Sequence, residues 1–405
     1  MKQLTGLQRD SVLFLHGRTP EFRRLPFSVQ WAIHRTLRNE KITALNGDYV
    51  INSFFPPLRS AAYREMVKST IAVYQKKPYP YSAYCAVTNR CGYHCWHCSR
   101  TKRANEELDT YAWQKIVGRL QETGVSLIGF TGGEPLYRAD LEDILRGICK
   151  DRSAAILFTS GEGLTRERLA SLRDAGLDYV AVSLDHYEPL PHNQMRGHPD
   201  AFTTALEAIE VCLTAGVYTA VQVMVRRELL VKNQMERFVS FVRDLGVPEI
   251  RIIEPMPTGE LFGGRDDVLL DNPMRAGLKK WHKAANQKPS GPKVAAFAYI
   301  EDGQQYGCGA GIQHMYIDAS GNLCPCDFTP LSFGHIPTEG FDVSYGRLRA
   351  AFARPARQCF LLRHQEALRE HYKGQLPLSY PDSLQICHSC PAGPVPDFYR
   401  HLGWT

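Results

Sequence analysis

The stretch Cys91-Gly92-Tyr93-His94-Cys95-Trp96-His97-Cys98 decides how the rest of this 405-residue sequence is interpreted. Its three cysteines have the spacing C-x3-C-x2-C, and no fourth cysteine follows closely. Three thiolates can hold three corners of an iron–sulfur cluster, which leaves one iron open to bind another molecule. Three unconnected cysteines or part of a zinc site are the alternatives, although zinc sites usually present their cysteines in two pairs. The stretch therefore predicts a cluster with an open coordination position.

The composition is that of a soluble globular protein with enough chain for two or three domains. A net charge of +6 is too weak to indicate a nucleic-acid partner, and it is compatible with an anionic substrate or contact with a membrane surface. We expect no signal peptide, and no apolar run approaches the length needed to span a bilayer. We therefore expect a cytoplasmic protein, with peripheral membrane contact left open, whose twelve cysteines serve metal or redox chemistry.

Short apolar strands alternate with amphipathic helices through the middle of the chain. Six such units imply parallel strands with right-handed crossovers, in a doubly wound sheet or an incomplete barrel. The predicted strands cover residues 84–87, 127–130, 154–158, 179–182, 218–225 and 250–253.

Polar residues and glycines follow successive strands at their carboxyl ends. After the cysteine stretch come Thr131-Gly132-Gly133-Glu134-Pro135, Thr159-Ser160-Gly161, Ser183-Leu184-Asp185 and Glu254-Pro255. The carboxyl ends of parallel strands meet at one edge, where such folds bind their ligands. We therefore predict one site built from many strand ends, although each motif alone could be an ordinary turn or cap.

The residue types at these ends suggest the kind of ligand. The two glycines let a backbone approach a ligand closely, and Glu134 could bind an amino group. Arg196 could form a bidentate pair with a carboxylate, or it could be a surface arginine. Hydroxyl groups of a ligand could be bound by Ser160, Ser183 and Asp185.

The cysteine spacing together with Gly132-Gly133-Glu134-Pro135 resembles the radical S-adenosylmethionine (SAM) superfamily over residues 81–257. The resemblance implies an α/β fold, a partial (β/α)6 TIM-like barrel, and a [4Fe–4S] cluster held by Cys91, Cys95 and Cys98. The open iron would bind SAM, and reductive cleavage would give methionine and a 5′-deoxyadenosyl radical that abstracts hydrogen from a substrate. The residues that would bind SAM by this resemblance are His97, Gly132, Gly133, Glu134, Ser160, Ser183, Asp185 and Arg196. Thr159-Ser160-Gly161 departs from the commoner Thr-Asn-Gly.

A second set of cysteines lies near the C-terminus, at positions 308, 324, 326, 359, 387 and 390. A hairpin about Ala319-Ser320-Gly321 is predicted to carry Cys324-Pro325-Cys326, and Cys387-His388-Ser389-Cys390 could grip a metal from two sides. Structural zinc is one interpretation of this set. Cys85, Cys149 and Cys212 fit core positions.

Residues 306–326 and 387–390 resemble the SPASM/twitch extensions of radical SAM enzymes. This resemblance implies one auxiliary [4Fe–4S] cluster that accepts or relays electrons. Its ligands would be Cys308, Cys326, Cys387 and Cys390, with Cys324 and Cys359 in reserve.

The sequence before residue 79 predicts an accessory segment. We expect a helix with Phe27, Trp31, Ile33 and Leu37 on one face, a hairpin about Asn46-Gly47, and a helix from about residue 63 to 74. One interpretation is a helical cap on the main domain. The other is a substrate-recognition or membrane-docking element, suggested by Arg23, Arg24, Trp31, Phe54 and Phe55.

The predicted organisation is therefore an accessory segment (1–78), a barrel (79–257), a linker with a helix (258–300) and an auxiliary-cluster domain (301–405). The predicted activity is hydrogen abstraction from a peptide, small metabolite or lipid-linked substrate, with net oxidation or bond formation. A flavodoxin or ferredoxin would supply electrons, and no nucleic acid would bind. A leader-peptide recognition domain is not clearly indicated, which weakens the peptide interpretation. The alternative is a non-catalytic iron–sulfur electron-transfer or zinc-binding protein on the same scaffold. No catalytic residue is assigned.

Overall fold

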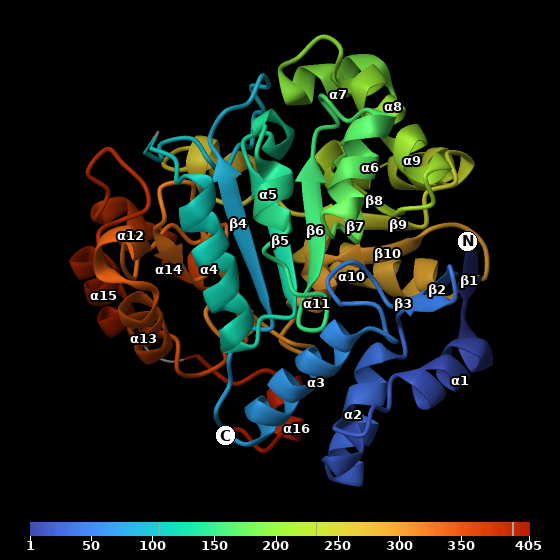
Figure 1. Ribbon diagram of the computed structural model, residues 1–405, viewed down its shortest axis with the longest axis horizontal. Helices are drawn as coiled ribbons and strands as arrows, with labels where there is room; N and C mark the ends of the chain where they lie inside the picture. Colours follow the sequence, from blue (N-terminus) through green and yellow to red (C-terminus); the bar gives the residue numbers. More distant parts are fainter. Residues whose placement is uncertain (105, 232, 391–392) are drawn as a thin grey trace.

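The computed structural model describes residues 1–104, 106–231, 233–390 and 393–405. Its centre is a nine-stranded sheet with the order β10-β9-β8-β7-β6-β5-β4-β11-β12, and helices cover its outer face (Figure 1). The order has two ends, so the sheet is an open barrel rather than a closed one. The expected partial barrel is thereby confirmed.

The six predicted strands are all present and pair in parallel. Alternate side chains face the helices outside and the barrel interior, where Tyr84, Phe158 and Tyr218 are buried. The strands are β4 (Ser82–Thr88), β5 (Leu127–Gly132), β6 (Ala154–Thr159), β7 (Tyr179–Ser183), β8 (Tyr218–Met224) and β9 (Glu249–Ile253). The connecting helices are α4 (Thr110–Thr123), α5 (Leu141–Leu145), α6 (Arg166–Asp174), α7 (Pro189–Arg196), α8 (Ala201–Thr214) and α9 (Gln234–Asp244).

Two further parallel strands extend the barrel. β10 (Lys293–Ala296) pairs with β9, and β11 (His314–Ile317) pairs with β4. The predicted helix of the linker segment is α10 (Asn272–Gln287), and α11 (Phe297–Ile300) follows β10. Residues 258–300 therefore return to the sheet. The predicted hairpin is β11 with β12 (Leu323–Cys324).

The N-terminal segment combines a three-stranded antiparallel sheet with three α-helices. Its elements are β1 (Lys2–Leu4), α1 (Gly6–His16), α2 (Phe27–Leu37), β2 (Ile42–Leu45), β3 (Asp48–Val50) and α3 (Ala61–Tyr74). The hairpin turn is confirmed, with Asn46 and Gly47 both at positive φ (50° and 81°), as a type I′ turn requires. The expected buried face of α2 is wrong in part, because Phe27 and Trp31 are 76% and 62% exposed while Val29 and Ala32 are buried.

The segment after β3 plugs the end of the barrel where the strands begin. Ser53 donates its backbone N–H and its hydroxyl to Glu249, and Arg251 donates to the Ser53 hydroxyl at 2.7 Å. Lys293 donates to the carbonyls of Val50 and Ile51 at 2.6 and 2.8 Å. The neighbouring Phe54 and Phe55 are buried, so they cannot form the docking surface that the sequence suggested.

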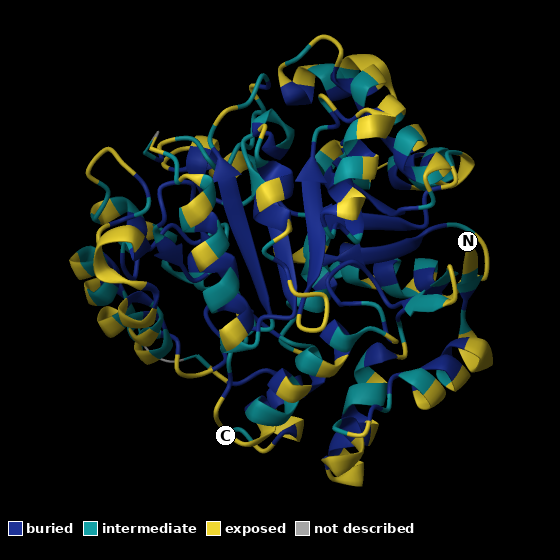
Figure 2. Ribbon diagram, viewed as in Figure 1, coloured by how far each residue is buried: buried dark blue, intermediate teal, exposed yellow. Residues whose placement is uncertain are grey.

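The C-terminal region packs helices beside β11 and β12. They are α12 (Ile336–Glu339), α13 (Phe341–Ala351), α14 (Phe360–Glu370), α15 (Tyr380–Ser389) and α16 (Asp397–His401). Figure 2 shows the barrel strands as a continuous buried layer, with exposed residues gathered on the outer faces of the helices. Among the helices of the described part of the chain, none combines the length and apolarity needed to cross a membrane.

Candidate functional site

The cysteine stretch follows β4 at the carboxyl end of the barrel, and its backbone is held from two sides. His94 and Trp96 donate backbone N–H groups to the carbonyls of Arg196 and Met195, at 3.1 and 3.3 Å. From the other side, Glu260 donates its N–H to the Cys98 carbonyl at 2.8 Å. An added Cβ at Gly259 would overlap that carbonyl, so this contact requires glycine.

The three thiols fit an iron–sulfur cluster by their chemistry. Cys91, Cys95 and Cys98 are all half-buried. Burial raises the pKa of Cys91 to about 11, and the charges of Glu134 and Cys95 act in the same direction. Burial also raises the pKa of Cys95, with Cys98 adding to the shift. Thiols that oppose one another's ionisation are stabilised as thiolates by bound metal, which removes their protons.

Within the described ranges, no group of three or more His, Cys, Asp or Glu side chains is positioned to hold one metal ion. An iron–sulfur cluster takes each thiolate on a different iron, so its ligands need not converge on one point.

The glycine pair packs against the start of the cysteine stretch. Gly133 donates its N–H to the Thr88 carbonyl at 2.7 Å, and Glu134 donates its N–H to the Arg90 carbonyl at 2.8 Å. Gly132 has a φ of 131°, and a Cβ on it would overlap the Thr88 carbonyl. These glycines therefore allow the backbone of the chain itself to approach closely. Their contact with a ligand, which the sequence suggested, stays a prediction.

Glu134 is buried and is held by hydrogen bonds from the end of β6. Its carboxylate accepts from the Ser160 N–H at 2.7 Å, the Ser160 hydroxyl at 2.6 Å and the Thr159 hydroxyl at 2.7 Å. Burial nevertheless raises the pKa of Glu134 above its usual range, although these hydrogen bonds oppose the shift. Glu134 and Ser160, which were predicted separately, thus form one unit.

Asp185 and Arg196 form a buried bidentate ion pair. Arg196 Nε lies 2.7 Å from Asp185 Oδ2, and Nη2 donates to Oδ1 at 2.9 Å. Although burial opposes ionisation, the guanidinium holds the pKa of Asp185 below its ordinary value. Arg196 Nη1 also reaches Cys95 Sγ at 3.9 Å, which links the pair to the thiols.

The other predicted SAM-binding residues lie close to this pair. Ser183 ends β7 and is partly exposed. Burial and the nearby guanidinium lower the pKa of His97 to about 4, so its ring is neutral near pH 7.

Two side chains at this end were not predicted. An added Cβ at Gly92 would lie 2.6 Å from the Tyr137 hydroxyl and 3.1 Å from Glu162 Oε2, so both side chains border the cysteine stretch. Glu162 directly follows Thr159-Ser160-Gly161, and Tyr137 lies two residues after Pro135 of the glycine–glutamate motif. Their places next to these motifs were the signal in the sequence that could have identified them.

A second thiol cluster lies beside the barrel, and its members differ from the predicted set. The thiols of Cys308 and Cys359 share a hydrogen bond, which lowers the pKa of Cys308 and raises that of Cys359. Both line one cavity of about 70 Å³ together with Cys326. Burial raises the pKa of Cys326, with charges on Asp327 and Cys308 contributing. The structure therefore joins two of the four predicted ligands to Cys359.

The remaining cysteines of this region lie elsewhere. Burial raises the pKa of Cys387 to about 12, and the charge of Cys390 adds to this shift. Neither lines the cavity beside Cys308 in the part of the chain that the structure describes. Cys324 is fully buried beside Arg103, which opposes the rise in its pKa caused by burial.

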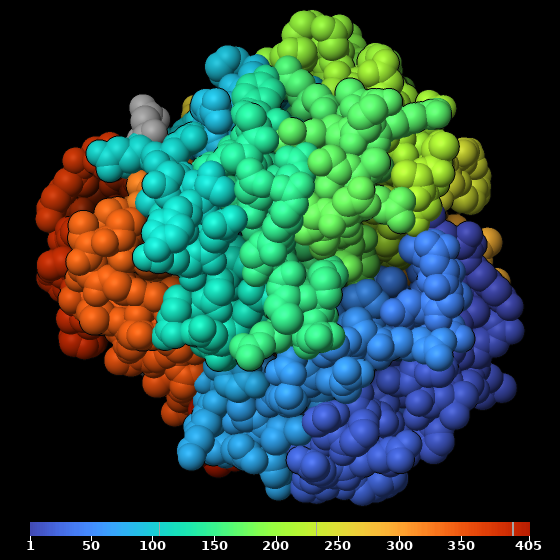
Figure 3. All heavy atoms as spheres, in the orientation of Figure 1, coloured from blue at the N-terminus to red at the C-terminus, as the bar shows by residue number. Residues whose placement is uncertain are grey.

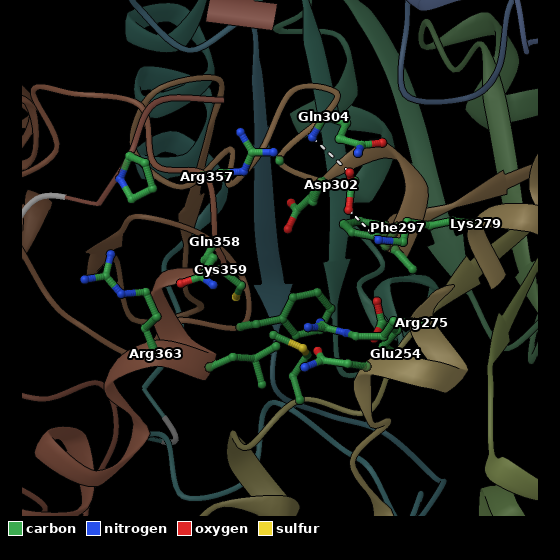
Figure 4. A pocket seen from close by; sticks show the side chains of 18 residues that line it. Glu254, Arg275, Lys279, Phe297, Asp302, Gln304, Arg357, Gln358, Cys359 and Arg363 are labelled. Atoms are coloured by element: carbon green, nitrogen blue, oxygen red, sulfur yellow. Dashed lines mark hydrogen bonds and ion pairs between the residues drawn. The ribbon is translucent and has the colours of Figure 1, made fainter. Parts of the chain in front are cut away.

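A lateral cavity of about 550 Å³ opens between the last barrel strands and the C-terminal region (Figure 4). Arg357, Cys359 and Arg363 enter from the C-terminal side, and Glu254, Arg275 and Lys279 from the opposite side. Its ion pairs are Arg275–Glu254 at 2.5 Å, Lys279–Asp302 at 2.6 Å and Arg357–Asp397 at 2.8 Å. The cavity thus joins a charged wall to one of the clustered thiols.

Comparison with known proteins agrees with this geometry. Residues 85–233 match the family described as the radical SAM superfamily. Over 247 residues the chain is 29% identical to a PqqA peptide cyclase of Streptomyces rochei, covering 59% of this chain and 67% of the relative. It is 25% identical over 274 residues to an AdoMet-dependent heme synthase of Oleidesulfovibrio alaskensis, covering 62% and 70% of the two chains.

Solved structures share the fold. SuiB of Streptococcus suis bound to S-adenosylmethionine superposes with a TM-score of 0.56 at 15% identity, covering 77% of this chain and 80% of SuiB. SuiB bound to its precursor peptide SuiA gives a TM-score of 0.55, also at 15% identity, covering 70% and 68% of the two chains.

Proposed function

Because this chain is a radical SAM enzyme with a C-terminal domain of the SPASM type, we propose that it abstracts hydrogen from a peptide, with net oxidation or bond formation. The observation that carries the SAM chemistry is the half-buried thiol trio at the end of β4, with Arg196 reaching Cys95. The peptide is supported by one relative named as a peptide cyclase and by a structural neighbour bound to a precursor peptide. These two relatives support a peptide substrate, which the sequence alone had made the weaker interpretation.

Cys91, Cys95 and Cys98 would hold the [4Fe–4S] cluster. When bound, that cluster supplies the electron that splits SAM into methionine and a 5′-deoxyadenosyl radical. Asp185 keeps Arg196 charged and oriented, so an N–H of the guanidinium can donate a hydrogen bond to the SAM carboxylate. Glu134, fixed by three hydrogen bonds from Thr159 and Ser160, is suited to the methionine amino group.

We further assign Ser183 to the ribose and neutral His97 to the surroundings of the adenine, both by their places at the strand ends. The buried Asp185–Arg196 pair also excludes water from this side of the site.

Cys308, Cys326 and Cys359 would hold an auxiliary cluster, with the fourth ligand supplied by Cys387 or Cys390. Such a cluster supplies electron transfer, and a flavodoxin or ferredoxin is the proposed external donor. The expected domain limits stay a prediction, and β10 and β11 add strands to the barrel from the segments expected as linker and auxiliary-cluster domain.

A carboxylated small molecule is the second candidate substrate. Arg275, Lys279 and Arg357 line the lateral cavity, and a carboxylated ligand would pair with them in place of their present partners Glu254, Asp302 and Asp397. A relative named as a heme synthase points in the same direction.

The test of the SAM chemistry is anaerobic reconstitution with iron and sulfide, followed by dithionite and SAM. We expect equal amounts of methionine and 5′-deoxyadenosine, and their loss in Cys95→Ala. Cys149→Ala is the matched control and should keep the activity, because Cys149 lies outside the site and is exposed, so its expected core position is wrong. Iron-loaded protein that forms no 5′-deoxyadenosine would contradict the proposal.

Deuterium transfer separates the two substrate classes. Deuterated peptides encoded beside the gene should pass deuterium into 5′-deoxyadenosine if the substrate is a peptide. If SAM is cleaved but only deuterated polycarboxylates pass on their label, the peptide assignment is wrong and the second candidate stands.

A further inference from the structure

Large apolar side chains are exposed mainly near the N-terminus. Eleven such residues are exposed in the described ranges, and six of them lie within the first 31 residues. These six are Met1, Leu7, Phe14, Leu15, Phe27 and Trp31. Apolar surface concentrated in one place is a mark of an interaction site.

Helices α1 and α2 each carry one apolar face toward the core and a second stripe toward solvent. Val12 and Leu13 of α1 are buried in the N-terminal core. The outer stripe of α1 has helical spacing and consists of Leu7, Ser11, Phe14 and Leu15. That of α2 consists of Trp31 and Arg35, and Arg38 follows at the C-terminal cap of the helix. Both stripes line one groove of about 690 Å³.

The charged residues of this groove are mostly basic. Arg35 and Arg38 are exposed in its wall. Asp10 is the sole carboxylate among the described residues that line it, and that carboxylate pairs with Arg9 at 2.8 Å. Arg18 lies over the Phe14 ring at 4.8 Å and adds another cation beside the groove. The groove thus combines an apolar floor with an excess of positive charge.

We propose that this α1–α2 groove binds an acidic amphipathic helix of a peptide or protein partner. Such a helix would place apolar side chains against Phe14, Leu15 and Trp31, and carboxylates against Arg35 and Arg38. The polar groups of Ser11 and His34 in the wall favour a peptide over lipid chains, because acyl chains would leave those groups without hydrogen bonds.

The occupant would dock away from the chemistry. The N-terminal segment lies where the barrel strands begin, at the lower right of the molecule, whereas the cysteine stretch is at the opposite barrel end (Figure 3). The inference is therefore independent of which atom loses hydrogen.

The test is selection from a displayed random library of peptides about 15 residues long, roughly four helical turns, against the full chain. We expect enrichment of acidic sequences with apolar residues at i, i+3 or i+4, and i+7. Enriched peptides should lose at least about tenfold in affinity for Phe14→Ser/Trp31→Ser and for Arg35→Glu/Arg38→Glu. The control Leu190→Ser/Val343→Ser removes exposed apolar residues elsewhere and should leave the affinity unchanged.

Four results would overturn the inference. Two concern the peptides: no enrichment over an empty support, or enriched peptides that bind the groove variants as well as the natural chain. The other two concern other occupants: Trp31-dependent binding of phosphatidylglycerol vesicles with no peptide selected, or self-association of the chain that Trp31→Ser abolishes. Far-ultraviolet circular dichroism of each variant establishes that it is folded before affinities are compared.

Discussion

Replacing Asp185 with Asn removes one charge from a buried pair and keeps the side-chain shape. The Asp185 carboxylate contacts the Arg196 guanidinium at 2.7 and 2.9 Å. The Asp185 side chain is 0% exposed and the Arg196 side chain is 9% exposed. A buried guanidinium that loses its partner destabilises a protein by about 3–5 kcal/mol. Because the Arg196 carbonyl holds His94, we expect the loss to reach the cysteine stretch as well.

Urea denaturation and 5′-deoxyadenosine formation measure the two consequences. Asp185→Asn should lower the free energy of unfolding by about 3–5 kcal/mol and slow SAM cleavage by at least about tenfold. The control is Glu228→Gln in the exposed Arg226–Glu228 pair, 42% and 70% exposed, which should cost no more than about 1 kcal/mol. A loss below about 1 kcal/mol with normal SAM cleavage would refute the role given to the pair.

The pair also predicts a dependence on pH. Burial favours the neutral carboxyl, but Arg196 holds the pKa of Asp185 below its usual value. Its stabilisation is therefore complete above the ordinary aspartate pKa and is lost as the pH falls through the lowered pKa. Asp185→Asn should lose less stability than the natural chain over that acidic range.

Three further changes test other parts of the structure. Gly133→Ala would push a Cβ into the Arg90 carbonyl and should lower the unfolding free energy by about 1–3 kcal/mol. Its control is Gly118→Ala in α4, which has open space around it and should raise the unfolding free energy by about 0.5–1 kcal/mol. Equal effects of the two changes in urea denaturation would contradict the packing described. Cys359→Ser should reduce iron per chain after reconstitution and Cys324→Ser should not, so the reverse pattern would remove Cys359 from the proposed auxiliary site. Burial lowers the pKa of Lys293 to about 7 from 10.5, so the unfolded chain binds the extra proton between these values and stability rises with pH. Relative to Lys293→Met, the natural chain should gain about 2 kcal/mol between pH 7 and 9, and a flat or falling difference in urea midpoints would show that Lys293 stays charged when folded.

Much of the barrel could be predicted because its information is local. Each of the six strands is a short apolar run ended by glycine or polar residues. This pattern can be recognised from the strand's own residues, without knowing which strands pair with it. β10 was missed because it has only four residues and begins with Lys293, a charged residue that becomes buried only through contacts to Val50 and Ile51. A contact across more than 200 residues leaves no periodic signal.

What the sequence could not show about the second thiol cluster and about α2 has similar physical reasons. The cysteine spacing predicts that thiols meet within one loop, but it cannot show that Cys359 packs on Cys308 from another helix boundary. In α2 the helical period was right and the buried side was wrong, because this helix has apolar residues on both faces. The α1–α2 groove follows from that difference.

The plug of the barrel has a consequence for synthesis of the protein. Val50 and Ile51 meet Lys293 only after about 240 more residues have been made. At ribosomal speeds of about 5–20 residues per second, this takes roughly 12–50 s. During that time Phe54 and Phe55 lack the partners that bury them and are exposed to chaperones or other nascent chains. A segment that is translated about 240 residues before its partner is therefore among the last to reach its final packing.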